Sequence, residues 1–167
     1  MRASERLFGR GALLRFGRSS WAGLVGELGR RAGGERESGA FLLAPSTAEW
    51  RVTRIVYFDD LDPDALDGGV ALHAPAFSAL WDLCRREALA VIGDVHTHPA
   101  SWVDQSSIDR GSSMVGRRGH VALIVPDLAA RTVRPREVGV HRHDGGGAWT
   151  SWTGRDAERR LYVGRWP

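Results

Sequence analysis

Apolar residues follow two patterns along the chain, short continuous runs and a helical repeat. Runs of this length, bounded by glycine, proline or acidic residues, are typical of buried strands. They predict strands at residues 12–16, 37–44, 50–58, 88–92, 120–125, 137–143 and 148–153. Between them, an apolar stripe with helical spacing predicts amphipathic helices at residues 19–32 and 76–89, with shorter helical pieces from 106 and at 155–160.

The ends of these elements are also marked in the sequence. Ser19 or Ser20 is expected to cap the first helix, and the Gly33-Gly34 pair to end it. The second helix carries a stripe that we expect to be buried, made of Phe77, Leu80, Trp81, Cys84 and Ala88. Strands that alternate with helices predict an α/β fold with a central mixed sheet flanked by helices, and residues 1–167 are expected to form a single domain.

The stretch from Gly93 to Pro99 carries the first candidate chemistry. It follows the apolar run 88–92, and Pro99 ends the predicted strand. Side chains two residues apart on a strand point the same way, so His96 and His98 share one face. Two neighbouring imidazoles supply half of a zinc site.

A third ligand is expected downstream, at Asp109. The pattern Ser106-x-x-Asp109 resembles a helix start, with Ser106 as the N-cap and the carboxylate in the first turn. Two histidines and one carboxylate leave a fourth position for water, the arrangement of catalytic rather than structural zinc, and zinc brings the pKa of such a water to about 7.

These residues carry a family resemblance. The order His-x-His, seven residues, Ser, two residues, Asp is the signature of the JAMM metalloproteases, also called the MPN-plus or JAB family, and His96, His98, Ser106 and Asp109 fit it without a gap. The resemblance implies an MPN fold and one catalytic Zn²⁺ held by His96, His98 and Asp109. It also implies that Ser106 donates a hydrogen bond to the oxyanion.

The family also places a glutamate on an early strand as general base. The segment Glu37-Ser38-Gly39, followed by an apolar run, is similar to that part of the family pattern. Glu35 lies two residues earlier and would point to the same face if the strand began sooner, so it remains an alternative to Glu37.

The resemblance further implies the substrate and the partners. They are a ubiquitin-like protein cleaved after its C-terminal glycine, and the activating and conjugating enzymes of a bacterial antiviral defence system. Trimming of a sulfur-carrier protein and hydrolysis of a small-molecule amide are the alternative enzymatic functions. MPN domains without metal serve as scaffolds, but they typically lack the ligand set present here.

Composition adds limits rather than chemistry. A chain of 167 residues is long enough to bury a core, and its net charge of +3, without a long basic run, gives little support for nucleic-acid binding. No apolar stretch reaches the roughly 20 residues of a membrane span, and arginines interrupt the N-terminal region where a secretion signal would lie. With one cysteine, Cys84, the expected location is the cytoplasm.

Three other features have a structural and a functional interpretation. His141-x-His143 precedes Asp144 and three glycines and is expected to mark a hairpin end rather than a metal site. The acidic residues of 59–67 are interpreted as a solvated loop, with attraction of a basic partner as the alternative. Trp102 is either a packing residue or a substrate contact.

Overall fold

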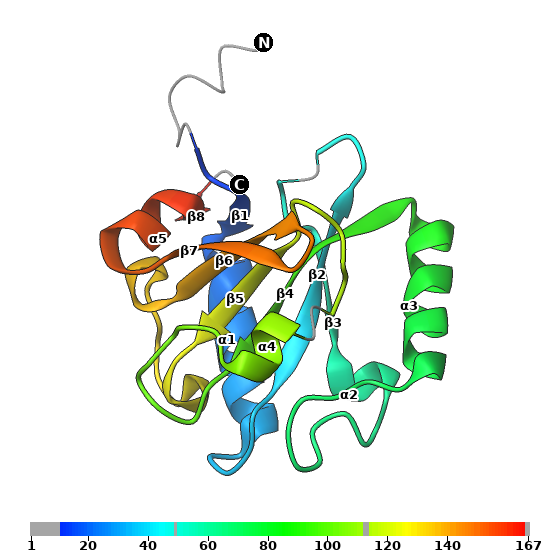
Figure 1. Cartoon of the computed structure of the whole chain (residues 1–167), viewed down its shortest axis with the longest axis horizontal. Helices are drawn as coiled ribbons and strands as arrows, with labels where there is room; N and C mark the ends of the chain where they lie inside the picture. The colour runs from blue at the N-terminus through cyan, green and yellow to red at the C-terminus, as the bar shows by residue number, and fades with distance from the viewer. Residues whose placement is uncertain (1–10, 49, 112–113, 166–167) are drawn as a thin grey trace.

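Six strands form the main sheet, in the order β3-β2-β4-β5-β6-β7 (Figure 1). The computed structural model describes residues 11–48, 50–111 and 114–165. Strands β4 and β5 run parallel, whereas the other neighbouring pairs are antiparallel. The strands are β2 (Gly39–Pro45), β3 (Arg54–Tyr57), β4 (Leu89–Thr97), β5 (Val121–Val125), β6 (Gly139–Gly145) and β7 (Ala148–Trp152). The predicted mixed sheet flanked by helices is confirmed.

A second, two-stranded sheet joins the early and late parts of the chain. Strand β1 (Leu14–Gly17) pairs in parallel with β8 (Leu161–Gly164), with Leu14 opposite Leu161. The strand expected at residues 12–16 therefore exists, but its partner lies near the other end of the sequence. A pairing between strands so far apart in the sequence cannot be recognised from a local pattern of residues.

The helices and helical turns lie on both sides of the main sheet (Figure 1). They are α1 (Arg18–Ala32), α2 (Phe58–Leu61), α3 (Ala74–Glu87), α4 (Ser107–Gly111), α5 (Gly154–Arg160) and the 3₁₀ turns η2 (Asp127–Ala129) and η3 (Pro135–Glu137). Helix α1 ends at Gly33, which has a positive φ of 60° as expected for a C-terminal glycine. Its N-cap, however, is Gly17. The expectation that Ser19 or Ser20 caps the helix is wrong, because β1 runs directly into it.

Alternate residues of β2 enter two separate hydrophobic cores. Ala40 and Leu42 face the core shared with α1, whereas Phe41 and Leu43 face a second core with α3. Helix α3 covers the second face over β2, β3 and β4. Trp81 and Ala88 were expected in the buried stripe of this helix, but Trp81 is 38% exposed and Ala88 is also exposed, so that part of the prediction is wrong. The buried face of α3 is therefore narrower than the face predicted from the positions of its apolar residues.

The acidic stretch 59–67 is partly helical rather than a plain loop. Because Phe58 begins α2, strand β3 is also shorter than the expected 50–58. Three carboxylates of the stretch face arginines of the same chain, in the pairs Arg31–Asp59, Arg31–Asp60 and Arg36–Asp67, and Asp62 contacts the His73 ring. Much of the local negative charge is therefore compensated internally.

The hairpin expected at 137–153 is confirmed as β6 and β7. Its turn contains Gly145, Gly146 and Gly147, all with positive φ, a conformation that side chains with a Cβ rarely adopt. In the described part of the chain, no helix is long and apolar enough to cross a membrane.

Candidate metal centre

The centre begins at the end of β4, on the face of the sheet that α3 also covers. Phe41 pairs with Asp94 and Gly39 with His96, so the period of two places Asp94, His96 and His98 on that face. His96 is 8% exposed and His98 is 2% exposed. Two buried imidazoles therefore project side by side from the central part of the sheet.

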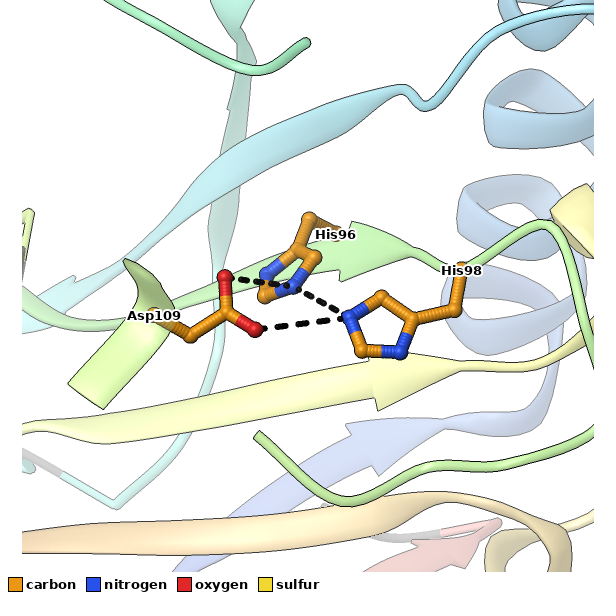
Figure 2. A group of neighbouring side chains, drawn as sticks. All are labelled: His96, His98 and Asp109. Carbon is orange, nitrogen blue, oxygen red and sulfur yellow. Dashed lines mark hydrogen bonds and ion pairs between the residues drawn. The ribbon is translucent and has the colours of Figure 1, made fainter. Parts of the chain in front are cut away.

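Asp109 completes a triangle with the two histidines (Figure 2). The Nε2 atoms of His96 and His98 are 3.1 Å apart, and each lies 3.5 Å from a carboxylate oxygen of Asp109. Ligands about 2.0–2.1 Å from a tetrahedral zinc ion are about 3.3 Å from one another. The two 3.5 Å distances go to different oxygens of Asp109, and one ligand atom from each residue lies within 4.8 Å of the others, a spacing compatible with a zinc ion.

Asp109 is positioned by the first turn of α4. Its carboxylate accepts a hydrogen bond of 2.7 Å from the backbone amide of Ser106, and its own amide donates one of 3.1 Å to Ser106 Oγ. This is the reciprocal capping box that the spacing predicted. The hydroxyl proton of Ser106 is not used in that pair, so it can still be donated to another group.

The charges of the triangle shift one another's pKa values. Burial lowers the pKa of His96, but the hydrogen bond to Asp109 and the charges of Asp94, Asp109 and Glu37 outweigh it, and the net shift is upward. Burial raises the pKa of Asp109, but the adjacent His96 and His98 rings hold it well below its usual range. A carboxylate that stays ionised beside two imidazoles favours a cation between them.

The second nitrogen of His98 is also occupied. Its Nδ1 lies 3.3 Å from the carbonyl oxygen of Trp102, which can only accept a hydrogen bond. The proton of neutral His98 therefore belongs on Nδ1, and Nε2 keeps a lone pair directed at the triangle. The Trp102 ring lies 4.1 Å from the His98 ring and is 46% exposed. Trp102 thus packs on a candidate ligand; substrate contact remains a prediction.

The backbone at His98 is held by the segment that follows β5. The amide of His98 donates to Val125 O at 2.9 Å, and the amide of Leu128 donates to His98 O at 2.8 Å. Asp127, Leu128 and Ala129 all have positive φ. Left-handed backbone costs non-glycine residues roughly 1–2 kcal/mol each. The surrounding contacts maintain this strained turn directly beside the centre.

Glu37 lies two residues before Gly39, the first residue of β2. Ser38 donates its hydroxyl to Leu28 O on the α1 side, so Glu37 points toward the opposite face, where the triangle lies. Its charge contributes to the raised pKa of His96, whereas Glu35 is exposed in the turn after α1. These placements favour Glu37 over Glu35 as the base, although that role remains a prediction.

A buried pair behind the triangle was not foreseen. Asp94 Oδ1 lies 2.5 Å from His120 Nε2, and both residues are nearly inaccessible. The signal was present, because Asp94 stands two residues before His96 and so shares its face. Its partner, 26 residues away, could not be identified without the fold.

The second His-x-His pair lies inside β6 and close to the hairpin turn, in agreement with the hairpin interpretation. His141 and His143 are both buried, and their ring nitrogens face main-chain oxygens or a serine rather than one another. His143 also packs against Trp149, whose indole N–H donates to Arg110 O, at the end of α4, at 3.3 Å. The hairpin therefore contacts the segment that carries Asp109.

Comparison with known proteins gives the fold but not a family. No family model matches the chain. The solution structure of a protein from Desulfitobacterium hafniense is similar with a TM-score of 0.61 and 15% identity, over 90% of this chain and 92% of that one. A protein from Salinibacter ruber gives 0.56 and 15%, over 83% and 88%. A JAB1/MPN domain protein from Archaeoglobus fulgidus gives 0.46 and 15%, over 90% and 95%. The first two similarities show that this arrangement of strands and helices occurs in other solved proteins.

Proposed function

We propose that the protein is a JAMM-type zinc peptidase that cleaves an amide bond after the C-terminal glycine of a ubiquitin-like protein. The observation that carries the proposal is the triangle of His96, His98 and Asp109, in which one ligand atom from each residue lies within 4.8 Å of the others. The motif spacing in the sequence supports the same assignment independently of the geometry. When bound, a zinc ion would polarise a carbonyl and lower the pKa of a water molecule to about 7.

Two further side chains would perform the proton transfers and stabilise charge. Glu37, on the triangle side of β2, takes the proton of the attacking water and delivers it to the leaving amine nitrogen. The hydroxyl of Ser106 donates a hydrogen bond to the substrate oxygen as it becomes negative. Both roles are compatible with the positions of these residues, and neither requires either residue to hold the metal.

The proposed substrate is a protein tail rather than a small molecule. A cavity of about 410 Å³ lies between α1 and residues 129–133 and includes no member of the triangle. A peptide can approach the metal centre as an extended segment beside the half-exposed Trp102. Activating and conjugating enzymes of a bacterial antiviral system are the proposed partners, on the resemblance alone.

Replacing Glu37 tests the reaction and the base together. In Glu37→Gln we expect the cleavage rate to fall about 10²–10⁴-fold, because the amide cannot accept the proton, while zinc affinity stays near that of the native protein. Purified protein would be incubated with isopeptide-linked and linear ubiquitin-like substrates and with a sulfur-carrier precursor, and the products identified by mass spectrometry. The chain contains no lysine, so it contributes no lysine-linked products of its own.

Glu35→Gln is the matched control, with the same change two residues away. We expect it to cleave at the native rate. Equal activity in Glu37→Gln and the native protein would assign the base elsewhere. Zinc-loaded native protein that cleaves no protein substrate but hydrolyses small amides would contradict the proposed substrate class.

A further inference from the structure

His141 lies in the middle of β6, on the same face of the sheet as the metal centre. It pairs with Ala122 on β5, two residues along each strand from the pair formed by Ile124 and Gly139. Because Ile124 also pairs with His96, the side chains of His141 and His96 project from one side. His141 has no exposed surface. A fully buried imidazole this close to the centre has no part in the proposed reaction.

Both ring nitrogens of His141 have partners that define its proton. Nε2 lies 2.9 Å from the carbonyl oxygen of Val103, and Nδ1 lies 2.8 Å from the hydroxyl of Ser151. A carbonyl can only accept, so Nε2 carries the proton, whereas the serine hydroxyl can donate to Nδ1. Neutral His141 satisfies both partners, and burial accordingly lowers its pKa.

The carbonyl that His141 holds is adjacent to the carbonyl that holds His98. Trp102 O accepts from His98 Nδ1, and Val103 O, one residue later, accepts from His141 Nε2. The close approach depends on Gly139, since a Cβ there would lie 2.0 Å from Val103 O. The loop bend is thus bound at consecutive carbonyls to a candidate zinc ligand and to β6.

We infer that His141 is a positioning residue that, through the Trp102–Val103 segment, fixes the tautomer and orientation of His98. The inference rests on the proposed zinc site but is independent of which substrate is cleaved. With Val103 O held, Trp102 O stays where it accepts the His98 Nδ1 proton, and His98 Nε2 remains free for the metal. Without the hydrogen bond from His141 to Val103 O, the loop is free to move away, and the proton of neutral His98 can lie on either ring nitrogen.

His141→Phe removes the hydrogen bond and keeps a buried ring. We expect zinc affinity, measured by competition with a chelator, to fall about tenfold. This is the usual loss when a residue that orients a metal ligand is replaced. In zinc-free protein, ¹⁵N NMR of the imidazoles should show the Nδ1–H form of His98 in the native chain and a mixture in the variant. His141→Gln, whose amide can donate to Val103 O, should restore much of both.

Val140→Ala is the control for stability, because Val140 is the neighbouring residue of β6, is equally buried and faces the α1 core. It should leave the His98 tautomer and zinc affinity unchanged. If His141→Phe does not fold, Ser151→Ala removes the hydroxyl that fixes the His141 tautomer and should give a smaller shift in the same direction.

An unchanged His98 tautomer in the folded His141 or Ser151 variant would overturn the inference. Failure of the native protein to bind zinc would instead contradict the proposed function, and the zinc-free NMR measurement would still decide the role of His141.

Discussion

Ser106 combines a structural and a proposed chemical role in one hydroxyl, and the roles can be separated by substitution. Ser106→Ala removes the acceptor for the Asp109 amide and should cost about 1 kcal/mol of local stability, seen as several-fold weaker zinc binding. Ser106→Asn keeps a good N-cap but lacks the hydroxyl. We expect it to bind zinc like the native protein and to lose about 10²-fold in kcat.

Chelator competition and steady-state cleavage measure these two effects on the same samples. Native kcat in Ser106→Asn would show that capping alone accounts for Ser106. Weak zinc binding in both variants would mean instead that the hydroxyl, and not merely a cap, is needed to hold Asp109.

For single residues of the site, the sequence predicted those contacts that depend only on the geometry of one strand or one helix. The shared face of His96 and His98 follows from the period of a strand, and the Ser106–Asp109 capping box from the start of a helix. The bond from His141 to Val103, across 38 residues, depends on how β6 meets the loop after β4. No local pattern of residues encodes that encounter.

Among the elements, α1 and α2 are joined by ion pairs of one side chain, Arg31. Its guanidinium contacts Glu27 at 2.8 Å, Asp60 at 2.8 Å and Asp59, and lies 4.2 Å from the Tyr57 ring centre, with 12% of the side chain exposed. Arg31→Met would leave Asp59 and Asp60 without this cation, and Glu27 with Arg30 alone. We expect the free energy of unfolding to fall by about 2 kcal/mol, measured by urea denaturation.

Arg30→Met is the matched control, because Arg30 also pairs with Glu27 but is 68% exposed. It should lower the free energy of unfolding much less than Arg31→Met does, because water and salt screen an exposed pair. Hydrogen bonds from Arg30 and Arg31 lower the pKa of Glu27 from 4.5 to about 2. A lowered carboxyl pKa stabilises the fold above pH 4.5 and loses that effect as pH falls toward about 2. The difference between native protein and Arg31→Met should shrink over that window; a constant difference would contradict the ionic origin.

The sequence predicted helices and strands more reliably than it predicted the contacts between them. The β6–β7 hairpin carries its own turn glycines and was expected in place. By contrast, η2 places Asp127, Leu128 and Ala129 in left-handed backbone without a glycine. Residue preferences argue against such a turn. Tertiary bonds from Leu128 to His98 and from Asp127 to Ala100 maintain it, so only the fold reveals it.

For the whole molecule, metal binding should add to stability without being required for folding. Both hydrophobic cores form from apolar side chains, and the triangle lies outside them. Zinc at 100 times its dissociation constant should therefore stabilise the native protein by about 2.7 kcal/mol, seen as a higher Tm, and EDTA should reverse the change. His98→Ala should melt at the same temperature with and without zinc.

An unfolded zinc-free protein would contradict this independence of the cores. A zinc-dependent rise in Tm that persisted in His98→Ala would place the metal elsewhere.

The pairing of β1 with β8 has a mechanical consequence. These are the first and last strands of the described chain, and they run parallel, with Leu14 beside Leu161 and Gly17 beside Gly164. Tension that draws the two ends apart acts on the strands in opposite directions along their length. It loads their hydrogen bonds in shear, all together, instead of opening them one after another. A force applied at the termini therefore meets its greatest resistance first at this small sheet, before any load reaches the strands that hold the histidines.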